Sequence, residues 1–371
     1  MEAKVKFFDY PLQFGVNKEK YLNIIEDTLT RGAYILGEDL ERFERNLAKF
    51  INVKYAIGVS NCTNALLLSL HAAGIGPGDE VISVSHTFVA TIEVIKFLGA
   101  TPILIDISDD HNMDAEKIEA AITKKTKAIM PVQLNGHICK NMNQIMDIAK
   151  KHNLLVIEDA AQSLGAHING KYAGTFGLTG CFSFYPAKLL GAFGDAGAIV
   201  TDDEAMYKKL KMLRNHGRGE GTPINMWGLN CRLDNLHGAV LDYKLTLLPD
   251  WIVRRREIAK KYYDGLSDIK ELLLPEKPGA DSSRYDVFQN YEIETENRDS
   301  LLKHMTDSGV QCPIQWGGMG VHQFEALDMG HFKLPRTERM FRNSLMLPLY
   351  PELEDEKIEY VISTVRKFFG K

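Results

Sequence analysis

Short apolar runs rich in β-branched residues alternate with helix-like stretches along much of this chain. The runs lie at residues 81–84, 102–107, 128–134, 154–157, 182–185 and 198–201. Helix-like stretches lie between most of them, at residues 91–98, 115–122, 142–152 and 204–213. Strand patterns that alternate with helical patterns are typical of α/β proteins, so we expect an α/β fold.

The size and composition of the chain limit the classes of protein it can form. Its 371 residues suit two domains, and we expect a large one at 1–245 and a smaller one at 246–371, linked by a long helix that Pro249 breaks. A net charge of −5 without a basic stripe argues against nucleic-acid binding, and no apolar run reaches the length of a membrane span. Five scattered cysteines without a C-x-x-C pair indicate no zinc site and no disulfide framework, and no signal segment stands at the start, so we expect a cytoplasmic protein without a metal.

One lysine, Lys188, stands alone among aromatic, glycine and small residues in the stretch 181–197. An isolated lysine in such surroundings is a candidate for a desolvated amine with a lowered pKa, which is the state that attacks a carbonyl to form a Schiff base. The alternative is that Lys188 merely extends from a loop into solvent.

An acid follows the apolar run at 154–157. Asp159 is expected at the carboxyl end of a buried parallel strand, where α/β sheets place groups that contact ligands. A pyridoxal 5'-phosphate (PLP) enzyme needs an acid against the ring nitrogen and a lysine for the cofactor aldehyde, and Asp159 and Lys188 supply both. Acids at strand ends also cap helices or bind metals, so this pair of acids, Glu158 and Asp159, is a weak signal alone.

A helix N-terminus suited to phosphate precedes the helix-like run at 65–73. Ser60, Asn61 and Thr63 are good capping residues, and the free N–H groups of a helix start can bind a phosphate. The alternative is that these residues only cap the helix.

Together these segments resemble the DegT/DnrJ/EryC1/StrS sugar aminotransferase family. The likeness covers nearly the whole chain, and its motifs occur in the family's order. They lie at residues 31–44, 60–66, 78–91, 158–166, 183–188, 214–217, 228–234 and 347–351. The resemblance implies the type I PLP-dependent aminotransferase fold, with a mostly parallel seven-stranded sheet in the large domain and a smaller C-terminal α/β domain. It also implies a homodimer whose active sites are shared between subunits.

The resemblance implies a reaction: transfer of an amino group, with L-glutamate as the expected donor, to a nucleotide-linked keto-deoxy sugar. Lys188 would bond to the cofactor and move the proton, and Asp159 would pair with the ring nitrogen. The remaining cofactor contacts would be Gln162 at the ring hydroxyl, Ser183, Thr63 and the backbone of Cys62 at the phosphate, His86 stacked on the ring, and Asn230 at the phosphate of the other subunit. Substrate contacts are expected from Tyr34, Tyr185, His216 and His322.

The chain departs from the family pattern at several positions. Cys62 stands where glycine is common, His86 where Phe, Tyr or Trp is usual, and Leu189 where Asn is frequent. Residues 314–324 also depart on the acceptor side, which leaves the sugar open. A branch of the family with histidine at the lysine position acts as sugar dehydratases, and Lys188 favours transamination over that alternative. A non-catalytic regulatory homologue on the same fold is the second alternative.

Overall fold

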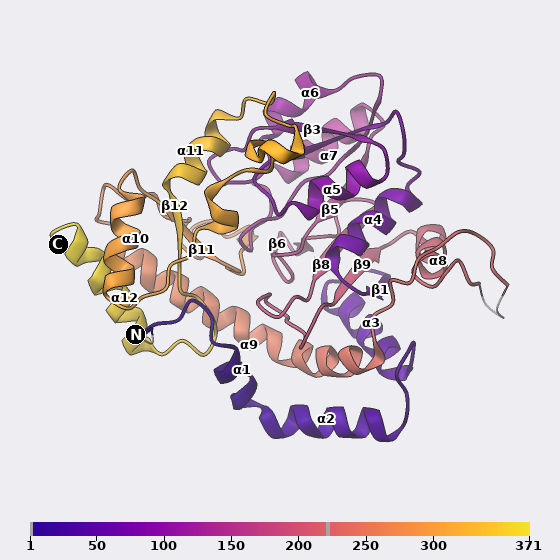
Figure 1. Ribbon diagram of the computed structural model, residues 1–371, viewed down its shortest axis with the longest axis horizontal. Coiled ribbons are helices and arrows are strands. Elements are labelled where there is room, and N and C mark those ends of the chain that lie inside the picture. The colour runs from indigo at the N-terminus through magenta and orange to yellow at the C-terminus, as the bar shows by residue number, and fades with distance from the viewer. Residues whose placement is uncertain (1–2, 220–222) are drawn as a thin grey trace.

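A seven-stranded sheet forms the centre of the larger part of the computed structural model, which describes residues 3–219 and 223–371 (Figure 1). The strands run in the order β1-β9-β8-β5-β4-β2-β3, and β9 alone among them is antiparallel to its neighbours. The sheet is therefore mostly parallel, as expected. Its strands are β1 (Tyr55–Val59), β2 (Glu80–Val84), β3 (Thr101–Ile105), β4 (Thr126–Ile129), β5 (Leu155–Asp159), β8 (Thr179–Ser183) and β9 (Gly197–Thr201).

Helices cover both faces of this sheet because alternate strand residues point to opposite faces and both sets are apolar. Val156 packs on one face and Ile157 on the other. The first face carries α3 (Glu38–Phe50), α7 (Met142–Lys151) and part of α9 (Asn235–Leu266). The second face carries α4 (Cys62–Ala72), α5 (Ala90–Phe97) and α8 (Glu204–Leu213). The two faces thus enclose the buried strands that position the site.

The strands expected from the sequence, and the helices expected at 91–98, 142–152 and 204–213, lie within a few residues of their predicted positions. The elements before β1 and after α9 had no predicted counterpart. β1 was not anticipated as a strand. The helix expected at 115–122 is instead a 3-10 turn, η1 (Ala115–Lys117), followed by the short α6 (Ile118–Ala121).

The long helix α9 runs unbroken through Pro249, contrary to the expected break. Its first half packs against α3 and its second half against α12 (Asp355–Phe368). Leu248 and Ile252 are buried on either side of the proline. This packing stabilises the helix across a residue that lacks an N–H group. The expected boundary between 245 and 246 falls inside this helix.

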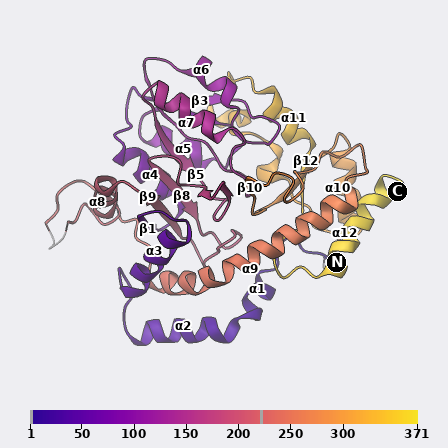
Figure 2. The same cartoon turned by 180° about the vertical axis from the view of Figure 1, so that it is seen from behind.

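The smaller part of the molecule is built on the antiparallel pair β11 (Tyr291–Glu294) and β12 (Ser344–Leu347), with its own apolar core. Val5 pairs with Val310 and is buried in that core, so the first described residues lie with the smaller part although 1–245 was expected to be the large domain. α2 (Lys18–Thr30) then runs along α9 (Figure 2). The remaining elements are α1 (Tyr10–Val16), α10 (Arg298–Asp307), α11 (Pro335–Asn343), η2 (Gln315–Gly318), η3 (Val321–Gln323), η4 (Glu325–Leu327), and a small sheet of β6 (His167–Ile168), β7 (Lys171–Tyr172) and β10 (Arg284–Tyr285). Among the described helices, none combines the length and apolar character needed to cross a membrane.

Candidate active site

The strand directions bring the expected cofactor residues to one edge of the sheet. β1, β5 and β8 are mutually parallel, so their carboxyl ends meet there, and β9 begins at the same edge. Val59 and Ser183 both lie opposite Gly197, and Asp159 lies opposite Cys181. The residues after β1, at the end of β5 and after β8 therefore surround one place, as ligand groups do in open α/β sheets.

Lys188 lies in the connection between β8 and β9, where its backbone N–H donates to the Tyr185 carbonyl at 2.8 Å. Burial lowers the pKa of its amine, and the negative charge of Asp159 opposes that shift. No hydrogen bond or ion pair to a described residue holds its Nζ. The side chain is thus partly buried, has no partner among the described residues, and is easier to deprotonate than an exposed lysine.

Asp159 is only 5% exposed, and its carboxylate is oriented by two donors. The Thr91 hydroxyl donates to Oδ2 at 2.7 Å, and the Ala161 N–H donates to Oδ1 at 3.2 Å. Burial raises the pKa of Asp159, while these hydrogen bonds and the charge of Lys188 oppose the rise. A cationic group beside this buried carboxylate would favour its ionised form.

The neighbouring Glu158 points to the opposite face of β5 and serves the fold. Its carboxylate accepts N–H groups from Gly174, Phe176 and Gly177 and the Gln133 amide. Asp159 is therefore the acid of the pair that faces the site.

The N-terminus of α4 meets the start of β9 at the same edge. The Asn61 side chain caps the helix by accepting the Asn64 N–H at 2.8 Å. The first N–H groups of α4, at Cys62 and Thr63, have no acceptor within the helix and can serve an anion. A Cβ at Gly197 would lie 2.5 Å from the Asn61 carbonyl carbon, so glycine allows this close approach. Burial raises the pKa of the Cys62 thiol and keeps it neutral.

Gln162, at the end of the loop after β5, presents its amide with a defined orientation. Its Oε1 accepts the Asn135 backbone N–H at 2.9 Å and the Asn290 Nδ2 at 3.3 Å. The two N–H groups on its Nε2 are left for another acceptor.

His86 does not fit the stacking role expected from its position. Its ring has no exposed surface and packs edge-on against Phe341 and Trp316, with ring centres 5.2 and 5.6 Å away. Its Nδ1 lies 2.8 Å from the His111 carbonyl oxygen, and burial lowers the pKa of His86 to about 4. In this structure the ring therefore has no exposed surface to offer a cofactor. The exposed aromatic ring of this loop belongs to Phe88, which is 57% exposed.

Four of the other expected contacts are exposed. Tyr185 directly precedes the lysine segment, and Tyr34 lies before α3. His216 and Asn230 lie on paired segments beyond α8, where the His216 N–H donates to the Leu229 carbonyl. His216 and Asn230 therefore lie on a surface hairpin. Neither residue takes part in the hydrogen bonds that orient Asp159 and Gln162.

His322 is enclosed, which does not support its expected place in the acceptor pocket. Its Nδ1 lies 2.7 Å from the Ser85 hydroxyl and its Nε2 3.4 Å from Glu338. The side chain is 3% exposed. In this structure His322 links the C-terminal part of the chain to the segment after β2 through its hydrogen bond with Ser85.

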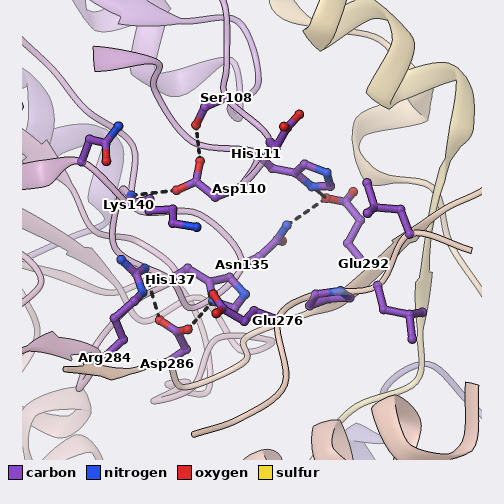
Figure 3. Close-up of a pocket in the computed structure, with 15 residues that line it drawn as sticks. Ser108, Asp110, His111, Asn135, His137, Lys140, Glu276, Arg284, Asp286 and Glu292 are labelled. Carbon is purple, nitrogen blue, oxygen red and sulfur yellow. Dashed lines mark hydrogen bonds and ion pairs between the residues drawn. The ribbon is translucent and has the colours of Figure 1, made fainter. Parts of the chain in front are cut away.

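A pocket of about 500 Å³ opens between the loops after β3 and β4 and the smaller part of the molecule (Figure 3). None of its described lining residues is among the expected site residues. Asn135 and His111 both point at the Glu292 carboxylate in its wall, at 2.8 and 3.1 Å. His111 also lies 2.6 Å from Glu294.

The sequence analysis missed this charged cluster because β11 reads Tyr-Glu-Ile-Glu. Alternation of apolar and acidic residues is typical of a strand with one solvent face. Glu292 and Glu294 are nevertheless 3% and 5% exposed.

Comparison with known proteins identifies the wider group of this chain. The model of the DegT/DnrJ/EryC1/StrS aminotransferase family matches residues 16–366. The chain belongs to this family.

Curated relatives agree with that membership over their full lengths. A dTDP-3-amino-3,4,6-trideoxy-alpha-D-glucose transaminase of Micromonospora megalomicea subsp. nigra is 35% identical over 365 residues, 97% of both chains. A protein of Geobacillus stearothermophilus named a pleiotropic regulatory protein is 35% identical over 370 residues, 98% of both chains.

Solved structures of family members share the fold. S. venezuelae DesV in complex with a ketimine intermediate is 36% identical, covers both chains completely and superposes with a TM-score of 0.95. NtdA of Bacillus subtilis with bound cofactor PMP is 31% identical, with a TM-score of 0.88 over 96% of this chain and 82% of its own. This DegT/DnrJ/EryC1/StrS member therefore has the type I aminotransferase fold and is a sugar aminotransferase.

Proposed function

We propose that this enzyme is a PLP-dependent aminotransferase that moves an amino group from L-glutamate to a nucleotide-linked keto-deoxy sugar. The observation that carries the proposal is the partly buried Lys188, which has no partner among the described residues, beside the buried Asp159 at the edge where α4 begins. The nucleotide-sugar transaminases among its relatives support the substrate class.

The residues at this edge fit PLP in charge and in shape. The free N–H groups at Cys62 and Thr63, with Ser183 nearby, suit a phosphate dianion. The buried Asp159 suits a protonated ring nitrogen, and the free N–H groups of Gln162 suit the ring oxygen. When bound, the cofactor supplies an electron sink for the carbon that loses its proton.

The chain contributes proton movement and orientation. Because its pKa is lowered, Lys188 can take a proton from one carbon and return it to another. Thr91 and the Ala161 N–H hold the Asp159 carboxylate in a single orientation. Ping-pong kinetics are expected, since the keto acid formed from the donor would leave before the sugar binds, while the amino group stays with the holoenzyme.

A homodimer with shared sites forms part of the proposal. Large apolar side chains are exposed close to the hairpin that carries Asn230 and near the N-terminal helices. Trp227 is 94% exposed, and Ile224, Tyr34 and Leu29 are also exposed. Exposed apolar groups of this size favour a covering surface, and a second copy would bring Asn230 toward the phosphate of its neighbour. All five cysteines are free, which suits the expected reducing cytoplasm.

The alternatives predict different chemistry. A sugar dehydratase on this fold would not accept an amino group from glutamate. A non-catalytic regulator would not need the reactive groups; the Geobacillus relative is named a pleiotropic regulatory protein. The retained Lys188, Asp159, Gln162 and Ser183 favour an enzyme.

The decisive experiment follows the absorbance of the PLP-loaded protein as L-glutamate is added. We expect the visible band to give way to a shorter-wavelength band, and a nucleotide-linked keto sugar to restore it. A visible band that glutamate leaves unchanged would overturn the donor. A band that glutamate converts but only keto sugar phosphates restore would overturn the nucleotide-linked substrate.

A further inference from the structure

Two adjacent amides of the smaller part of the molecule contact the expected cofactor residues of the larger part. Gln289 and Asn290 directly precede β11, and each is 8% exposed. The first bonds to the segment of Lys188 and the second to Gln162. One dipeptide thus touches both sides of the proposed cofactor site.

Gln289 bonds to the peptide groups on both sides of Lys188. The Leu189 N–H donates to its Oε1 at 2.8 Å, and its Nε2 donates to the Ala187 carbonyl at 2.8 Å. A primary amide carries one acceptor and a donor group in a fixed plane, so this pair of bonds fixes the backbone that bears the lysine. The side chain of Lys188 itself stays free.

Asn290 helps to set which end of the Gln162 amide faces outward. The Asn135 backbone N–H can only donate, so the atom that meets it must be the oxygen of Gln162. Asn290 adds a second donor to that same oxygen. The donating Nε2 of Gln162 is therefore the end of the amide that neither Asn135 nor Asn290 contacts.

The orientation of Asn290 is in turn fixed by a chain of bonds that ends at a carboxylate. Its Nδ2 donates to Asn135 Oδ1 at 2.9 Å, and Asn135 Nδ2 donates to Glu292 Oε2 at 2.8 Å. Burial alone would raise the pKa of Glu292, but the hydrogen bond and charge of His111 hold it below its ordinary value. The ionised carboxylate can only accept, so each amide in the chain has one orientation.

The backbone before the dipeptide adopts a conformation that a bulky residue rarely takes. Phe288 has φ 52°, and the Val287 N–H donates to the Gly136 carbonyl at 2.9 Å. A Cβ at Gly136 would lie 2.5 Å from the backbone nitrogens of Phe288 and Gln289. Such strain persists where the surrounding structure requires it, and it is concentrated at functional sites.

We propose that Gln289 and Asn290 are positioning residues, the first for Lys188 and the second for the donating end of Gln162. This inference rests on the proposed function, because Lys188 and Gln162 need positioning only if they hold PLP. It assigns the smaller domain a direct part in preparing the cofactor site.

The test of Asn290 is the pH titration of the visible absorbance of the holoenzyme. Gln162→Leu should raise the midpoint by about one pH unit, because a lost donor strengthens the ring oxygen's hold on the neighbouring proton. Asn290→Leu should shift it in the same direction by roughly half a unit, and the double variant should match Gln162→Leu alone. Gln315→Leu is the matched control, since Gln315 donates to Asn135 but not to Gln162. It should leave the midpoint unchanged.

The results distinguish a failure of this inference from a failure of the proposed function. No shift in Gln162→Leu would overturn the role of Gln162 in the proposed function. If Gln162→Leu shifts the midpoint and Asn290→Leu does not, the inference is overturned. It is also overturned if the midpoint of the double variant shifts beyond that of Gln162→Leu. If Asn290→Leu does not fold, Asn290→Asp, which has the same shape but no N–H, is judged by the same outcomes.

The test of Gln289 is the rate at which the full-length chain, freed of cofactor, develops the visible band with added PLP. Gln289→Leu should slow this step by about tenfold, because the backbone of Lys188 is no longer held. Gln289→Glu keeps the acceptor for the Leu189 N–H and should give an intermediate rate. A wild-type rate in Gln289→Leu, or in Gln289→Glu if the first does not fold, would overturn this half of the inference.

Discussion

Lys188 and Glu292 are both ionisable groups near the junction of the two parts of the molecule, the first partly buried and the second fully buried, yet the protein surrounds them differently. Around Lys188 the backbone is fixed while the amine has no described partner. Around Glu292 the charges are paired: His111 lies within hydrogen-bond distance of Glu292 and Glu294, and Arg336 pairs with Glu294. Unpaired enclosed charge is unfavourable in a fold and useful to a reaction, whereas paired charge serves the fold.

The pKa values follow the same division. Burial lowers the pKa of Lys188, and Asp159 only partly offsets the shift. Burial would also lower the pKa of His111, but the hydrogen bonds that its ring donates to two carboxylates, together with their charges, raise it to about 9. Charged partners therefore outweigh burial at His111, whereas burial outweighs the single charged partner at Lys188.

The largest expected effect comes from replacing Lys188, the group without a described partner. Lys188→Ala should lower kcat/KM for amino transfer by at least about 10⁴-fold, because the nucleophile and proton carrier is lost. Its free energy of unfolding should change little, since the amine has no described partner to lose. Stopped-flow absorbance with glutamate and urea unfolding measure the two quantities. Lys188→Arg, which keeps the charge, should be equally inactive, and near wild-type turnover in either variant would contradict the assignment.

The second prediction concerns the paired charges around Glu292. Glu292→Leu should lower the free energy of unfolding by about 3 kcal/mol, because His111 loses one carboxylate and the Asn135 amide loses its acceptor. Urea unfolding of the holoenzyme measures the change. Glu296→Leu, at an exposed acid just beyond β11, is the matched control and should be nearly neutral. Equal stability of the two variants would show that the cluster does not stabilise the fold.

The smallest expected effect is the contribution of His111 to the pH dependence of the free energy of unfolding. The pKa of His111 is raised from about 6.5 in the unfolded chain to about 9, so its stabilisation is complete below pH 6.5 and is lost as the pH rises to 9. We expect the free energy of unfolding to fall over that window by about 2 kcal/mol more in the wild type than in His111→Asn. Asparagine tolerates the φ of 64° at this position. Parallel pH profiles of the two proteins would rule out this role for His111.

The sequence could predict that Asp159 and Ser183 lie at one edge of the sheet, because that placement depends on local order along the chain. Strand ends carry Asp159 and Ser183, and a parallel sheet must bring them together. β1 escaped because its glycine-containing run, Tyr55–Val59, is short and gives a weak strand signal.

The contacts between the two parts of the molecule could not be predicted, because only the tertiary fold brings their residues together. Glu292 and Glu294 have the alternation of a solvent-facing strand, and only the packing of the smaller domain buries them. His86 was assigned from its position in a motif, while its actual neighbours, Trp316 and Phe341, lie more than 200 residues away. Pro249 was read from its intrinsic preference, which packing along both halves of α9 overrides.

The continuity of α9 limits how the two domains can move. At 1.5 Å per residue its 32 residues form a rod about 48 Å long that belongs to both domains. Opening the molecule like a hinge would require this rod to bend, and Pro249, where one backbone hydrogen bond is missing, is the weakest point along it. Rocking of the smaller domain about the long axis of the rod requires no such bend. Any relative motion of the two parts that keeps this rod straight is therefore a rotation about its axis rather than the opening of a hinge.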